Sequence, residues 1–274
     1  MDFLWILILL GYTICVTQSL ISLTSSRPML PRVALASLMV AFGSQTVWLL
    51  LRGLQTGRFP VAGTQEMCAF LSWGLVISYL IAARWYRADA LKAFIFPIIL
   101  VLSTVAAIAP VTPVTTLGIE SPFQSILFPV HAGLILLAYC AFFIAFGAGL
   151  MYMIQERELR HKRLGRVFYR LPSLETCDAI SFRTTAIGFV LLTLGIAAGI
   201  IWLHAQDPEG RYFKGEPDEI FAVFSWLVYL FMIQSRINAR WGGRTAALAS
   251  VISFMLVVCS LVGLRYFGTL HTFG

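Results

Sequence analysis

Histidine is the residue type in this chain best suited to binding a metal, and three of the four histidines deserve comparison. His131 lies in "FPVHAGLILLAYC", His204 follows the apolar run "GIIWL", and His271 lies in the closing "GTLHTFG". A neutral imidazole is the commonest transition-metal ligand in proteins, and two imidazoles can hold a heme iron through its two axial bonds. His131 and His271 are therefore candidate iron ligands. In the alternative, both are interfacial residues that keep a polar tip among the lipid headgroups.

The elements that must position these histidines are membrane-spanning helices. Of the 274 residues, 59% are hydrophobic and only 12% are charged, whereas soluble domains carry about 25% charged residues. Several apolar runs approach the about 20 residues that a helix needs to cross a bilayer, while barrel strands would show about 10 residues with strict alternation. The sequence therefore predicts an all-α, polytopic membrane protein. Spans are expected at residues 3–23, 33–52, 66–84, 92–109, 126–153, 183–203, 220–236 and 246–266.

Two further patterns concern the ends of these spans. The first apolar run is expected to be a retained span, because it has no basic segment before it and no small-residue cleavage site. In "LPSLETCDAISFR", Ser173 follows a proline and precedes two acidic residues, which predicts a helix start. This start belongs either to an extended sixth span or to a short interfacial helix before it.

The basic residues predict how the chain is oriented in the membrane. With the N-terminus outside, 15 of the 20 Lys and Arg residues fall in inner loops; the outer exceptions are Arg52, Arg58, Arg211, Lys214 and Arg265. Short cytoplasmic loops carry such an excess of positive charge. Both termini and the loop 204–219 are therefore expected on the outer side, in a membrane predicted to be the bacterial cytoplasmic (inner) membrane. The net charge of +7 suits orientation and contact with anionic lipid rather than binding to nucleic acid.

The interior of the predicted spans disfavours several functions. Ion pumps and proton-coupled transporters usually keep ionisable groups at membrane depth, and no such residue falls near the middle of a span. Gln18, Gln45 and Gln234 are expected to form hydrogen bonds between helices. The chain also offers no nucleophile beside a base, no phosphate-binding loop and no dinucleotide fingerprint. We therefore expect a protein that is not an enzyme.

The second half of the chain resembles the heme-handling cytochrome c assembly family, specifically its shorter CcsA-like and HemX-like members with eight spans. The resemblance covers residues 126 to 273 and rests on "FPVHAGLILLAYCAFFIAFGAGLMYMI", "LPSLETCDAISFRTTAIGFVLLTLGIAAGIIW", "FSWLVYLFMIQSRINARWGGRTAALASVISFMLVV" and "GLRYFGTLHTF". No internal repeat or low-complexity linker divides the chain, so a single membrane domain over residues 1–274 is expected. Within it, the resemblance implies a four-span family region in 126–274, which follows four variable spans in 1–125. It also implies heme as the cofactor, with His131 and His271 at the positions of the outer axial ligands.

The charged segment "EGRYFKGEPDE", residues 209–219, occupies the place of a family motif. Heme-binding members carry here a tryptophan-rich signature, WGxxWxWDPKE, on which heme lies, and none of its three tryptophans is present in this chain. The segment therefore resembles a degenerate heme shelf, in which Tyr212 and Phe213 cover a porphyrin face and Arg211 or Lys214 pairs with a propionate. In the alternative, it is a solvated outer loop.

Three hypotheses for the function follow. The resemblance implies a non-enzymatic membrane protein that binds or presents heme at the outer face and assists cytochrome c maturation or heme supply, with maturation proteins as partners. The second hypothesis is a regulator or scaffold whose basic inner loop, residues 155–170, docks a heme-biosynthesis protein. The third is a structural subunit of a larger membrane complex that no longer binds heme.

Overall fold

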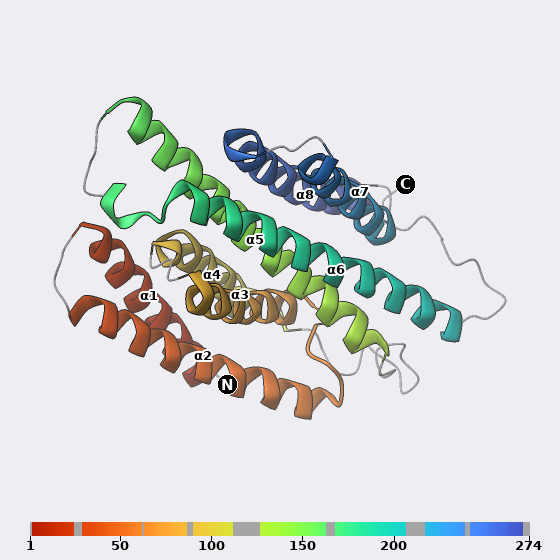
Figure 1. Ribbon diagram of the computed structural model, residues 1–274. Helices are drawn as coiled ribbons and strands as arrows, with labels where there is room; N and C mark the ends of the chain where they lie inside the picture. The colour runs from red at the N-terminus through yellow and green to blue at the C-terminus, as the bar shows by residue number, and fades with distance from the viewer. Residues whose placement is uncertain are drawn as a thin grey trace. The chain divides into compact units, whose positions relative to one another are not determined.

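In the part of the chain that the structure describes, the fold is a set of eight α-helices (Figure 1). The computed structural model describes residues 2–24, 29–61, 63–86, 90–111, 127–162, 168–206, 217–238 and 242–270, without the side chains of 2, 22–24, 29–31, 206, 217–218 and 260–270. The helices are α1 (Asp2–Thr24), α2 (Met29–Thr56), α3 (Thr64–Tyr86), α4 (Leu91–Ile108), α5 (Leu127–Arg160), α6 (Leu174–Gln206), α7 (Pro217–Asn238) and α8 (Gly243–Leu270). Each predicted span overlaps one of them, so the all-α prediction is confirmed.

The surface of these helices is that of a membrane protein. Helices α1 to α7 are long and apolar enough to cross a membrane by length and composition, and the side chains described for α8 include the apolar stretch Gly243–Cys259. Large apolar side chains are widely exposed, with Phe3 69%, Ile108 78% and Leu54 80% accessible. Soluble monomers rarely expose apolar surface on this scale. The chain is thus an integral membrane protein, while the orientation of its termini stays a prediction.

Helix α6 begins at Leu174, well before the predicted span start at residue 183. The Ser173 hydroxyl accepts a hydrogen bond from the Thr176 backbone N–H at 3.2 Å, which satisfies one of the donors left open at a helix N-terminus. The helix start predicted at Ser173 is therefore confirmed, and it belongs to the extended sixth span. Further along, the Asp178 carboxylate accepts two hydrogen bonds from the Arg236 guanidinium of α7, at 2.9 and 2.8 Å.

Replacing Asp178 with asparagine is expected to lower the free energy of unfolding by about 1–2 kcal/mol, because a two-bond, charge-assisted contact is lost at a partly exposed site. The Asp178 side chain is 29% exposed, so water screens part of the interaction. Denaturant unfolding in mixed micelles measures the change. Glu175→Gln, at an exposed site in the first turn of the same helix, serves as the control. Equal effects of the two substitutions would contradict a role for the pair with Arg236.

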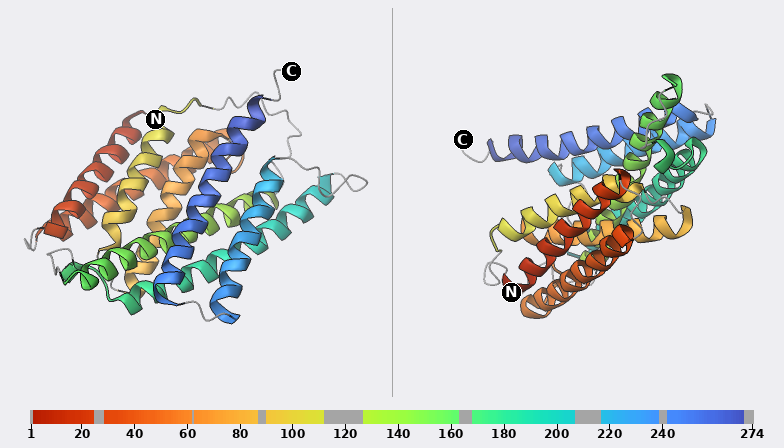
Figure 2. Two further views of the ribbon diagram at one scale, coloured as in Figure 1. Left: turned by 90° about the horizontal axis from the view of Figure 1, so that it is seen from above. Right: turned by 90° about the vertical axis from the view of Figure 1, so that its left-hand side faces the viewer.

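The chain divides into two compact units, and each is described by itself. Unit 1 comprises residues 1–129 and 157–172, and unit 2 comprises 130–156 and 173–274. In unit 1, α1 packs against α2 and α4, and α3 packs against the same two helices, so the four close into a bundle (Figures 1 and 2). Whether residues 1–274 act as a single membrane domain stays a prediction.

A buried amide joins three helices of unit 1. The Gln45 side chain of α2 accepts a hydrogen bond from the Tyr12 hydroxyl of α1, and it donates to Ser72 and to the Ala69 carbonyl of α3. The Gln45 side chain is fully buried. The predicted use of Gln45 as a polar link between helices is thus confirmed, whereas Gln234 of α7 is exposed.

The core of unit 2 is aromatic and lies where α5, α6, α7 and α8 meet. Its buried members are Ala138, Phe142, Leu192, Phe221, Tyr229, Met232 and Val257. The rings of Phe142 on α5 and Tyr229 on α7 are stacked, with an interplanar angle of 7°. Helices α6, α7 and α8 also contact one another pairwise, so each anchors the others. This packing holds the first turns of α5, which include His131, against the last turns of α6.

Candidate functional site

His131 lies at the start of α5, and its imidazole rests on the last turns of α6. The ring is partly buried, and its Nδ1 is 2.8 Å from the carbonyl oxygen of Gly195. The indole of Trp202 stacks beside it, with ring centroids 6.2 Å apart and an interplanar angle of 21°. The Gly195 carbonyl and the Trp202 indole of α6 therefore both contact this one side chain. Because α5 begins where α6 ends, the site lies at the end of both helices that is predicted to face outward.

Glycines on α6 make this close contact available. A Cβ atom at Gly199 would lie 2.5 Å from Nδ1 and 2.6 Å from Cε1 of His131. A Cβ atom at Gly195 would lie 2.7 Å from Cγ1 of Ile135, one turn further along α5. Small residues allow membrane helices to approach closely, and here they let a ring lie directly on a helix backbone.

The contact with Gly195 determines which ring nitrogen of His131 can bind a metal. A backbone carbonyl only accepts hydrogen bonds, so Nδ1 must carry the proton in this contact. In the neutral imidazole, Nε2 then carries the lone pair. Histidines that bind metals through one nitrogen almost always donate the other N–H to a carbonyl, a carboxylate or water. The local arrangement thus fits a metal ligand.

The other predicted site residues are not brought to His131 by the part of the chain that is described. His271, Arg211, Tyr212 and Phe213 lie outside the described residues. His204 is exposed in the last turn of α6. Among the described side chains, no group of three or more His, Cys, Asp or Glu residues is arranged to hold a metal ion. Heme needs only axial ligands from the protein, since its macrocycle supplies the remaining iron ligands.

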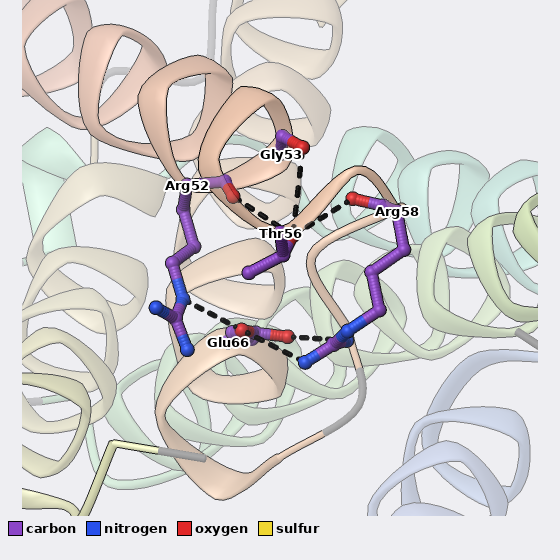
Figure 3. A network of polar contacts seen from close by, with 5 residues as sticks. All are labelled: Arg52, Gly53, Thr56, Arg58 and Glu66. Carbon is purple, nitrogen blue, oxygen red and sulfur yellow. Dashed lines mark hydrogen bonds and ion pairs between the residues drawn. The ribbon is translucent and has the colours of Figure 1, made fainter. Parts of the chain in front are cut away.

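A second polar cluster, which sequence reasoning missed, lies in unit 1. Helix α2 ends at Thr56, and Gly57 follows with φ +63°, a left-handed conformation suited to glycine at a helix end. The Thr56 hydroxyl donates to the Arg52 carbonyl at 2.8 Å and lies 3.3 Å from the Arg58 carbonyl. The turn thus places two arginines beside each other, and both reach Glu66 in the first turn of α3 (Figure 3).

The three side chains of this cluster form a buried triad, Arg52–Glu66–Arg58. Nε of Arg52 is 2.8 Å from Oε1 of Glu66, and one terminal nitrogen of Arg58 is 3.0 Å from Oε2. Glu66 is 1% exposed, and the arginines are 7% and 8% exposed. The triad joins the end of α2 to the start of α3. In the sequence, Arg52 and Arg58 stood out only because they are among the five basic residues that fall outside the predicted inner loops. That departure was the one sequence signal that could have pointed to the triad.

Comparison with known proteins adds the family. Residues 61–271 match the family described as Cytochrome C assembly protein. The chain belongs to the cytochrome c assembly protein family. It is 27% identical over 268 residues to the cytochrome c biogenesis protein CcsA of Synechococcus sp. (strain CC9605). The aligned region covers 89% of this chain and 88% of the relative. It is 28% identical over 276 residues to CcsA of Synechococcus sp. (strain CC9902), with 92% and 88% covered.

The matched region includes the histidine site and part of the Arg52–Glu66–Arg58 triad. The region shared with the cytochrome c assembly protein family begins before α3 and ends at residue 271, so it contains both His131 and His271. It also contains Glu66, whereas the two arginines of the triad precede it. A further relative, CcsA of Prochlorococcus marinus (strain MIT 9301), is 27% identical over 250 residues, with 84% of this chain and 80% of the relative covered.

Proposed function

We propose that this membrane protein binds heme at its outer face, with His131 and His271 as axial ligands, and assists cytochrome c maturation without being an enzyme itself. The observation that carries the proposal is the hydrogen bond from Nδ1 of His131 to the Gly195 carbonyl, which leaves Nε2 as the ligand atom. Family membership supports the pathway, because the relatives reported above are named cytochrome c biogenesis proteins.

In this mechanism the chain binds and orients a cofactor, and the redox and attachment chemistry belongs to the heme. His131 offers a lone pair from a ring whose rotation is limited by Gly195 on one side and Trp202 on the other. His271, which the family resemblance implies as a ligand, would be the second residue to hold the iron. Arg211, Tyr212 and Phe213 remain the proposed contacts of the propionates and the porphyrin face.

The test is an absorption spectrum of the purified protein in detergent, oxidised and reduced, followed by hemin titration. His131→Ala and His271→Ala are each expected to abolish the low-spin spectrum. Loss of a contact that only supports a ligand lowers metal affinity by about 10–100-fold, and these two variants should lower hemin affinity by more than that. A spectrum and affinity unchanged in both variants would refute the ligand assignment.

A matched variant separates ligation from a purely structural role of His131. Asparagine keeps an amide N–H near the position of Nδ1, so His131→Asn can retain the hydrogen bond to Gly195 while removing Nε2. We expect His131→Asn to unfold at the temperature of the wild type and to lose hemin binding. If His131→Asn binds hemin as the wild type does, His131 is a structural residue, and the proposal fails.

The regulator and subunit hypotheses stay predictions. In the predicted inner loop, residues 155–170, His161 and Lys162 directly follow the end of α5 and are exposed. Neutralising Arg160, Lys162 and Arg163 together tests this loop. Loss of cytochrome c maturation in that variant, with intact hemin binding, would favour a docking role.

A further inference from the structure

We propose that Gly199 is a positioning residue. Because Gly199 has no side chain, the His131 ring can lie against α6, where the Gly195 carbonyl accepts a hydrogen bond from Nδ1–H. This contact fixes the Nδ1–H tautomer and leaves Nε2 as the metal-binding atom. This inference rests on the proposed function where it concerns heme, but it makes a statement about His131 that holds without any cofactor. In this inference, residues of α6 determine which nitrogen of His131 can bind a metal, although His131 itself lies on α5.

The contacts with the imidazole come from one face of α6. Residues 195, 199 and 202 are spaced four and three apart, so they lie in line along the helix surface. The Gly195 carbonyl accepts the Nδ1 hydrogen bond at one end, and the Trp202 ring stacks at the other. Gly199 lies between them, directly beneath the ring.

The distances at Gly199 show why its size matters. A Cβ atom there would lie 2.5 Å from Nδ1 and 2.6 Å from Cε1, well inside van der Waals contact. A single methyl group must therefore push the imidazole away from α6. Because Nδ1 is the atom nearest to the methyl group, the hydrogen bond to Gly195 is the contact that breaks. Without that acceptor, the proton is free to occupy either ring nitrogen.

The consequence for a bound metal follows from the hydrogen bond. A carbonyl that accepts from Nδ1–H orients the ring and raises the basicity of Nε2, and loss of such outer contacts typically costs 10–100-fold in metal affinity. Gly199→Ala is therefore expected to lower hemin affinity by about 10–100-fold. The loss should be smaller than that of His131→Ala, because the ligand itself remains.

Two other glycines provide matched controls. Gly188 lies on the same helix, and a Cβ atom there would meet the Phe142 ring at 2.6 Å, so Gly188→Ala disturbs α5–α6 packing away from His131. Gly133 lies on α5 two residues from His131 and has nothing within 4 Å of an added Cβ atom. Gly188→Ala reports general helix packing, and Gly133→Ala reports a harmless methyl group beside the site.

The first experiment is ¹⁵N NMR of the heme-free protein with labelled histidine, in which His131→Asn identifies the His131 signals. The wild type, Gly133→Ala and Gly188→Ala are expected to show the Nδ1–H tautomer at His131. Gly199→Ala should show a mixture of tautomers. An unchanged Nδ1–H tautomer in Gly199→Ala, or a mixture already present in the wild type, would overturn the inference.

The second experiment is hemin titration and redox potentiometry of the same variants. We expect weaker binding and a shifted reduction potential in Gly199→Ala, with both values unchanged in Gly133→Ala. If Gly188→Ala produces the same shift as Gly199→Ala, the effect is general packing and the inference fails. If His131→Asn binds hemin normally, the proposed function fails instead, while the tautomer result in the heme-free protein still stands.

Discussion

Replacing Glu66 with glutamine is expected to lower the free energy of unfolding by about 3–5 kcal/mol, because removing one partner of a buried ionic contact leaves uncompensated charge in the interior. Glu66 is 1% exposed and accepts hydrogen bonds from Arg52 at 2.8 Å and Arg58 at 3.0 Å. Glutamine keeps the size of the side chain but carries no charge, so two guanidiniums would face each other without their shared carboxylate. Denaturant unfolding in mixed micelles measures the loss.

The balance of charges in the triad predicts which of its variants is the least stable. Arg58→Met leaves one arginine with one glutamate, a balanced pair, so it should destabilise less than Glu66→Gln. Replacing all three residues with methionine removes every charge together, and well-packed apolar replacements of buried ionic groups are often neutral or stabilising. We therefore expect the triple variant to be more stable than Glu66→Gln alone. If Arg58→Met is as damaging as Glu66→Gln, the charge-balance explanation is wrong.

Replacing Gly11 with leucine is expected to lower the free energy of unfolding by about 3 kcal/mol, the upper end of the usual cost of overpacking. A Cβ atom at Gly11 of α1 would lie 2.8 Å from Cβ of Ala41 and 3.1 Å from the backbone oxygen of Ser37, both on α2. Backbone atoms cannot rotate away as a flexible side chain does, so α1 and α2 must separate. Helix association in a membrane depends on such close packing.

The control for this substitution lies on the partner helix. A Cβ atom at Gly43 of α2 would have nothing within 4 Å, so Gly43→Leu should change the free energy of unfolding by less than about 0.5 kcal/mol. Thermal unfolding in one detergent, followed by the loss of helical circular dichroism, compares the two variants. Equal destabilisation by Gly11→Leu and Gly43→Leu would show that leucine, rather than the α1–α2 contact, is responsible.

Local patterns in the sequence were sufficient to predict the helices. Apolar runs of membrane length predicted all eight of the helices described, because each span satisfies its own backbone hydrogen bonds and needs no partner to be recognised. The serine before "LETC" predicted the start of α6 for the same reason, since a cap acts within one turn. Four motifs between residues 126 and 273 predicted the family, which the match over residues 61–271 then established.

The sequence predicted a link between helices through Gln45, but these patterns did not reveal which residues meet between helices. The pairing of Arg52 with Glu66 crosses a turn whose path depends on the positive φ of Gly57. The hydrogen bond of His131 joins residues 64 positions apart, and it exists only because Gly199 lets α6 approach α5. Hydropathy and helix caps are properties of one segment, so the sequence by itself determined the class, the spans and the family. Which side chains meet depends on the rotation and register of packed helices, and only the tertiary structure decided that.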